Sequence, residues 1–193
     1  MNFFFLIQEL FVFFSASTKR WSILKSNLCN VTNLTLKPLS DTRWSSRIDA
    51  ITPLRYQLGE VYDALFEISE GNFENNVKNL TASLAKKLQN FEFICILILW
   101  YNILNKVNIV SKIIQKPNFD VAQCCNHLNN LNNFLKAYRS DVGFNDLLID
   151  AKEIASSLDI EPKFKKTKRS NTTKNKKNIL IIYVTMNRST TKL

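Results

Sequence analysis

Residues 36–50, LKPLSDTRWSSRIDA, place side chains suited to nucleic-acid binding at the expected start of a helix. Arg43 carries a guanidinium group that pairs with phosphate, and Trp44 carries an indole that stacks on a base. Arg47 follows one helical turn after Arg43, which puts two guanidinium groups on one face beside the indole. Backbone amides at a helix start also attract phosphate. The pattern therefore indicates a candidate nucleic-acid contact.

A second interpretation gives Trp44 an ordinary place in a hydrophobic core. Trp44 shares a predicted helix face with Ile48 and Ile51, as a core aromatic residue does. The dipeptide also occurs a second time, as Arg20-Trp21, so it is not specific by itself. From the residues alone the core interpretation is favoured, and the nucleic-acid contact stays open as the alternative.

The net charge of +10 is concentrated in the C-terminal tail. Residues 1–162 hold 16 basic and 16 acidic side chains, whereas residues 163–193 hold 10 basic ones and no acid. The run KFKKTKRSNTTKNKK fits a nuclear-localisation or phosphate-contact segment, and it equally fits a solubilising linker. Its candidate phosphate contacts are Lys163, Lys165, Lys166, Lys168 and Arg169. The remainder of the chain is electrically balanced and is not a generally basic nucleic-acid binder.

The cysteines do not predict a metal site. Cys124, Cys125 and His127, the only histidine, stand close together, but a structural zinc ion needs four tetrahedral ligands. Cys29 and Cys95 are far away in sequence. We expect helical Cys and His side chains beside a core, and reduced thiols of an intracellular protein.

Carboxylates that converge on one point, as acid–base catalysis requires, are not indicated. Asp146, Asp150 and Glu153 are spread over polar helix faces, and the chain has no Gly-rich phosphate loop. The sequence therefore predicts neither a complete active site nor a cofactor.

Apolar residues recur at helical spacing throughout residues 1–160, and no alternating strand pattern occurs there. We expect an all-α bundle of six or seven helices over 1–160, followed by a basic, disordered tail over 161–193. Helices are expected at 3–15, 18–28, about 41–70 with a kink or break at Pro53, 73–81 running into 82–115, 119–140 and 144–158. Ser40 or Asp41 is expected to cap the third. The run ILIIYV (179–184) has no partner strand in such a fold.

No membrane span is expected. The N-terminal apolar run has no basic region before it and is interrupted by Gln8 and Glu9. The run FICILILWYNIL (93–104) is about 12 residues long, whereas a span needs about 20. Because its apolar residues occupy every face, we expect a buried central helix.

Longer stretches of the chain carry a family resemblance. FxxxQELFxFFSASTKRWxxLK, followed by LTLKPLSDTRWSSRxDAI, resembles zinc finger MYM-type protein 1-like sequences, which derive from hAT (hobo/Activator/Tam3) transposases. LWYNILNKVNIVSKIIQKPNFDV, LKAYRSDVGF, AKEIASSLDI and PKFKKTKR fit the same family in the same order. The resemblance covers about residues 3–170.

The resemblance implies a ribonuclease-H-like transposase whose core is interrupted by a large all-α insertion, and this chain resembles that insertion. The family's three catalytic acids and its dimerisation region would lie outside the chain, and Cys124/His127 does not match the family's C-x-x-H motif. Arg43 and Trp44 match its T-R-W motif, whose tryptophan is implied to stack on a flipped base.

We therefore expect a nuclear, DNA-associated, transposase-derived helical fragment without enzymatic activity, which binds DNA through the T-R-W motif and the basic tail. A protein partner or homo-oligomer is compatible with the sequence. The alternative is a protein-interaction helical module, or a decayed gene fragment, with no DNA role.

Overall fold

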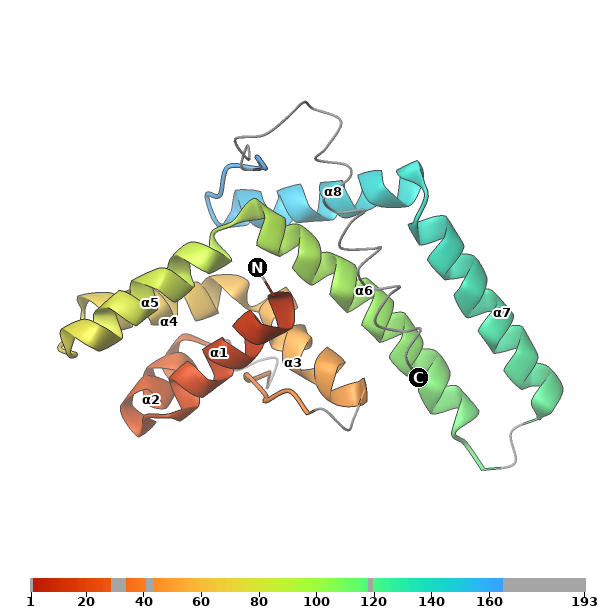
Figure 1. The fold of residues 1–193 in the computed structure, drawn as a ribbon, viewed down its shortest axis with the longest axis horizontal. Helices are drawn as coiled ribbons and strands as arrows, with labels where there is room; N and C mark the ends of the chain where they lie inside the picture. Colours follow the sequence, from red (N-terminus) through yellow and green to blue (C-terminus); the bar gives the residue numbers. More distant parts are fainter. Residues whose placement is uncertain (1, 29–33, 41–43, 118–119, 165–193) are drawn as a thin grey trace. The chain divides into compact units, whose positions relative to one another are not determined.

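The computed structural model describes residues 2–28, 34–40, 44–117 and 120–164, and these residues form eight α-helices and no β-strand (Figure 1). The helices are α1 (Phe3–Ser15), α2 (Thr18–Asn27), α3 (Trp44–Tyr56), α4 (Leu58–Glu70), α5 (Asn75–Leu88), α6 (Phe91–Ile114), α7 (Val121–Tyr138) and α8 (Asp141–Ser157). The predicted all-α helical bundle is confirmed over these residues, with eight helices where the sequence predicted six or seven.

The chain divides into two units, Met1–Pro162 and Lys163–Leu193, close to the boundary that composition places after residue 160. All eight helices belong to the first unit. Residues 165–193 lie outside the described part of the chain, and so do the predicted disorder of the tail and the apolar run 179–184.

Helix α6 is the central helix of the first unit. Its residues 93–99 are buried one after another, so its first half is enclosed on every side. The predicted buried central helix is therefore confirmed for this half. From Trp100 onward most of its side chains are half-buried or exposed, apart from Leu104 and Val110. The second half of α6 consequently offers surface for a site.

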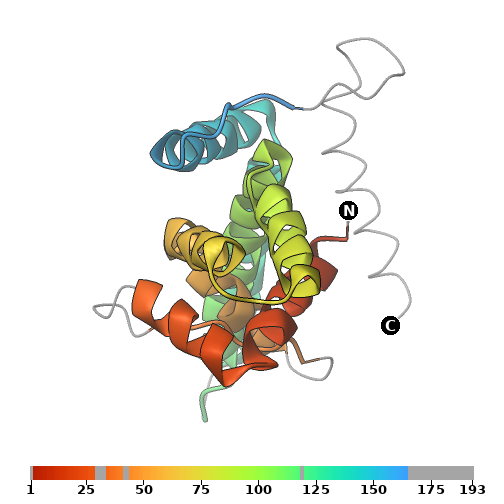
Figure 2. The same cartoon turned by 90° about the vertical axis from the view of Figure 1, so that its left-hand side faces the viewer.

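Helices α1, α3 and α8 bury apolar side chains around this centre. Helix α1 contributes a row of aromatic rings, of which Phe3 lies 5.6 Å from Phe93 and Phe4 lies 4.8 Å from Trp100. Helix α3 runs along α6 and buries Ile48, Ile51 and Leu54. Helices α4 and α5 lie side by side (Figure 2), and α8 crosses the first half of α6 (Figure 1). The site region between α3 and α6 is thus held by packing on both helices.

Polar side chains set several helix starts. The side chains of Asn2, Ser17, Asn90 and Ser140 each accept a hydrogen bond from a first-turn amide of the helix that follows. Such caps satisfy amides that have no partner within the helix. Local residues therefore determine where α1, α2, α6 and α8 begin.

Two helix boundaries differ from the expected ones. The chain continues helically through Pro53 and breaks at Gln57 instead. The amide of Gln57 bonds to the Pro53 carbonyl (2.8 Å) and so closes the last turn of α3. The Gln57 side chain then donates to the Leu34 carbonyl (3.2 Å). In the second case, the Asn90 cap separates α5 from α6, so that 73–81 and 82–115 are not one continuous helix.

Among the described residues, α6 is the one helix long and apolar enough to cross a membrane. It is 24 residues long, and its most apolar 18-residue window has a mean hydropathy of 1.7. The apolar run is thus part of a longer helix than the 12 residues counted in the sequence. Half of that window is buried inside the protein, and the core helix of a soluble protein has the same length and composition.

Candidate nucleic-acid interface

The T-R-W motif lies at the start of α3, whose first residue is Trp44. Arg43, Asp41 and the side chain of Trp44 lie outside the described part of the chain. In the third helical position, the Ser46 hydroxyl accepts from the Ser40 amide (3.0 Å) and donates to the Ser40 carbonyl (3.0 Å). This pair of hydrogen bonds ties Ser40 to the first turn of α3.

Arg47 faces α1. Its guanidinium carbon lies 5.1 Å from the centroid of the Phe4 ring, and the side chain is half-buried. The Phe4 ring in turn packs edge-on against Trp100 of α6. A cation over an aromatic face is stabilising. Arg47 therefore joins α3 to α1, in addition to any contact with phosphate.

The second Arg-Trp pair provides an internal comparison. The Arg20 guanidinium lies 4.6 Å over Phe13, and Trp21 packs edge-on against Phe11 at 6.2 Å. Both side chains of this pair thus contact α1. At the start of α2, an Arg-Trp pair serves packing between helices.

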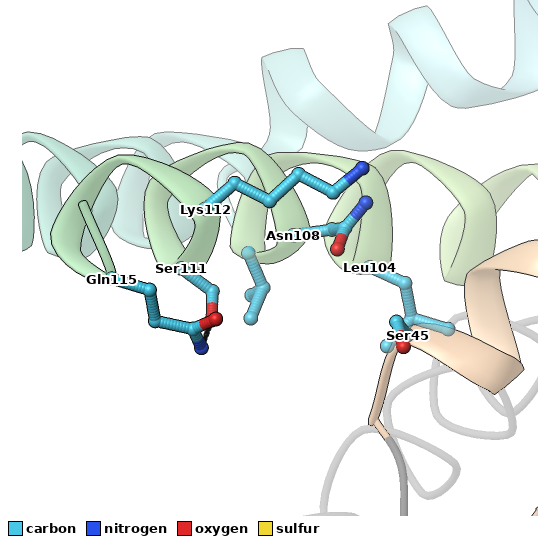
Figure 3. A pocket seen from close by; sticks show the side chains of 7 residues that line it. Ser45, Leu104, Asn108, Ser111, Lys112 and Gln115 are labelled. Carbon is cyan, nitrogen blue, oxygen red and sulfur yellow. Dashed lines mark hydrogen bonds between the residues drawn. The ribbon is translucent and has the colours of Figure 1, made fainter. Parts of the chain in front are cut away.

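A groove of about 500 Å³ opens at the first turn of α3, at Ser45 (Figure 3). Ser45, the residue after Trp44, lines it from α3, and the second half of α6 supplies the other wall. The α6 side chains in the wall are Leu104, Val107, Asn108, Ser111, Lys112 and Gln115. Its volume falls within the range of about 300–1,000 Å³ that is usual for ligand sites.

The groove combines groups that bind a nucleotide. Lys112 provides a positive charge, and the first turn of α3 provides the positive end of a helix dipole. Asn108 and Gln115 carry amides that both donate and accept hydrogen bonds. The Gln115 amide also donates to the Ser111 hydroxyl (3.0 Å). Among the described residues of the lining, no carboxylate is present that would repel a phosphate.

The α6 residues of the groove were not identified from the sequence. Asn108, Ser111, Lys112 and Gln115 recur at intervals of three or four, which is the spacing of one helix face. This polar stripe on an otherwise apolar helix is the pattern that would have revealed them. Its position next to Ser45, however, depends on the packing of α3 against α6.

The remaining candidate contacts lie in the tail. Lys163 is exposed, whereas Lys165, Lys166, Lys168 and Arg169 lie outside the described part of the chain. The two parts of the predicted interface thus belong to different units.

Cysteine, histidine and acidic side chains do not gather into a metal site within the described ranges, where no group of three or more occurs. Cys124 and His127 are half-buried on α7, Cys125 is exposed, and Cys95 is buried in α6. Burial, together with the negative charge of Glu92, raises the pKa of the Cys95 thiol to about 12. On α8, Asp146 and Glu153 are exposed and Asp150 is half-buried.

Comparison with known proteins gives no family assignment. No protein-family model matches the chain, and neither a curated protein nor a solved structure matches it. The resemblance to hAT transposase-derived sequences therefore stays a prediction.

Proposed function

We propose that this chain is a transposase-derived, DNA-associated helical protein that binds DNA without cleaving it. The T-R-W motif and the groove between α3 and α6 contact the DNA, and the basic tail adds sequence-independent attraction. The family resemblance supports the absence of cleavage, since it implies no catalytic acid among these residues. The basic run at residues 163–177 and the family resemblance support a nuclear location.

The observation that carries the proposal is the position of the groove. Ser45, which follows the T-R-W motif in the chain, lines a groove whose described residues include a lysine, two amides and two hydroxyls and no acid. Phosphate contacts from lysine position a protein on DNA, while amides and stacked aromatic rings contact the bases. Both kinds of group thus line a groove whose α3 wall begins one residue after Trp44, the residue implied to stack on a base.

Replacement of Lys112 tests the groove. Lys112 and Lys152 are both exposed helical lysines, but Lys152 lies on α8, away from the groove lining. Lys112→Ala is expected to weaken DNA binding and to reduce the slope of log K against log salt by about 0.7–0.9, the loss of one phosphate contact. Lys152→Ala is the matched control and should leave the slope unchanged. Equal slopes for the two variants would remove the groove from the proposal.

Helix α7 favours a second candidate function, the binding of a second copy of this chain. None of its 18 residues is buried, and Val121 and Leu128 are 76% and 48% exposed. An apolar helix face with so little cover is typical of an interaction site. If α7 mediates self-association, the protein should sediment as a dimer and Leu128→Lys as a monomer. A monomer for both would exclude this candidate.

A further inference from the structure

Three side chains outside the groove form a second cluster of interest, where the end of α3 meets the middle of α6. The hydroxyl oxygens of Tyr56 and Tyr101 lie 2.7 Å apart, and their rings pack edge-to-face at 5.6 Å. The guanidinium carbon of Arg55 lies 5.7 Å from the Tyr56 ring centroid and 6.0 Å from that of Tyr101. Tyr56 is 56% exposed, so the cluster is open to solvent.

Arg55 has a charge without a counter-ion. It makes no hydrogen bond or ion pair with any residue that the structure describes, and its Nε–H is buried with no acceptor. A buried donor without an acceptor is unfavourable. Arg55 lies in the last turn of α3, where the negative end of the helix dipole attracts its positive charge. The faces of the two tyrosine rings attract the same charge. Neither interaction supplies the acceptor that a guanidinium group uses.

The two tyrosines add a neutral donor beside this charge. Burial, followed by the hydrogen bond shared with Tyr56, raises the pKa of the Tyr101 phenol to about 12. Tyr101 therefore stays protonated and uncharged at physiological pH. Because one hydroxyl of the pair donates to the other, the second O–H is free to donate to a ligand. The cluster thus presents a guanidinium group and a phenol O–H.

The cluster lies on the same face of α6 as the groove. Tyr101, Asn108, Lys112 and Gln115 are separated by seven, four and three residues, so they follow one another along that face. Tyr101 precedes Asn108 by two helical turns, about 10 Å along the axis. A DNA strand that occupies the groove and continues along α6 would bring its phosphate backbone to Arg55.

We propose that Arg55, Tyr56 and Tyr101 form a subsite for a phosphate oxyanion. The oxyanion supplies the counter-charge of Arg55 and accepts from its terminal N–H groups, which are not among the buried atoms, and it accepts from the free tyrosine hydroxyl. That the phosphate belongs to a DNA backbone rests on the proposed function, whereas the affinity for the oxyanion itself does not.

Two variants of the full chain test the subsite. Tyr56→Phe keeps the exposed ring and removes the hydroxyl, and Tyr62→Phe on α4, whose hydroxyl accepts from Gln89 (2.8 Å), is its matched control. Arg55→Gln removes the charge. Binding of a fluorescein-labelled single-stranded oligonucleotide is measured over a range of salt, and inorganic phosphate is titrated while the tyrosine ring resonances are followed by NMR.

With DNA, we expect Arg55→Gln to weaken binding by about tenfold or more and Tyr56→Phe by a few-fold, as charged and neutral hydrogen bonds do, and Tyr62→Phe to bind normally. With phosphate, the resonances of Tyr56 and Tyr101 should shift in the wild type and not in Arg55→Gln. If Arg55→Gln unfolds, as judged by circular dichroism, Tyr56→Phe carries the test in both measurements.

The outcomes separate the two proposals. Normal DNA binding by Arg55→Gln and Tyr56→Phe, with no phosphate-induced shift, overturns the subsite and leaves the proposed function standing. A phosphate shift that requires Arg55, in a protein that does not bind DNA, supports the subsite and overturns the DNA function. Neither binding nor a shift overturns both.

Discussion

At the scale of single residues, Cys95 and Cys125 place the same thiol in opposite surroundings. Cys95 is 2% exposed in the enclosed half of α6, and Cys125 is exposed on α7. Desolvation and the Glu92 carboxylate disfavour the Cys95 thiolate, which is the form that reacts. Burial therefore protects Cys95 in two ways, by exclusion of the reagent and by retention of its proton.

This contrast predicts the order of thiol modification. At pH 8, a maleimide or disulfide reagent should modify Cys125 in the native protein and reach Cys95 only after unfolding in denaturant. Peptide mapping by mass spectrometry identifies the modified residue. Because the Cys95 pKa is raised to about 12, an increase from pH 7 to pH 9 should still leave Cys95 unmodified in the native protein. Modification of both at similar rates in the native state would show that the first half of α6 is not enclosed.

At the scale of helices, the corner between α7 and α8 depends on Gly143. A Cβ atom at this position would lie 2.7 Å from the Tyr138 carbonyl oxygen and 2.8 Å from that of Ala137. Both neighbours are backbone atoms, so the corner itself would have to move. At Gly59 of α4, a Cβ atom would meet the end of the Leu158 side chain at 3.0 Å, and that end can rotate away.

The two glycines therefore predict different changes in stability when each is replaced by alanine. Alanine is favoured over glycine within a helix by about 1 kcal/mol. Gly59→Ala should stay within about 1 kcal/mol of the wild type, whereas Gly143→Ala should lower the free energy of unfolding by about 1–3 kcal/mol, as overpacking does. Urea melts give the two values. A Gly143→Ala protein as stable as Gly59→Ala would exclude a close corner.

The helices and the buried central helix could be predicted from the sequence because local residue patterns determine them. Contacts between residues on different helices could not be predicted. The caps at Ser17 and Ser140 and the stop at Gly71 depend on neighbouring residues only. The proximity of Ser45 to Lys112, and of Tyr56 to Tyr101, depends on how α3 packs against α6. Arg47 shows the difference. Its spacing from Arg43 can be read from the sequence, but its contact with Phe4 depends on how α1 packs against α3.

At the scale of the whole molecule, charge is divided between an electrically balanced helical unit and a tail with 10 basic residues. Attraction between basic side chains and DNA releases counterions, so it weakens as salt rises. If the tail supplies this attraction, removal of residues 163–193 should weaken DNA binding strongly at low salt and flatten its salt dependence. Filter binding or fluorescence anisotropy at several salt concentrations measures both. An unchanged slope would assign the attraction to the helical unit.

The central claim is that the T-R-W motif contacts DNA, and the most direct test compares Trp44→Ala with the wild type on two substrates. Affinities are measured for hairpin DNA with an unstacked base and for plain duplex, beside urea melts of both proteins. We expect a selective loss on the hairpin, since a stacked base contributes about 1–3 kcal/mol, with little change in stability. A loss of about 3–5 kcal/mol in stability without a preference between the substrates would make Trp44 a core residue and contradict the proposal.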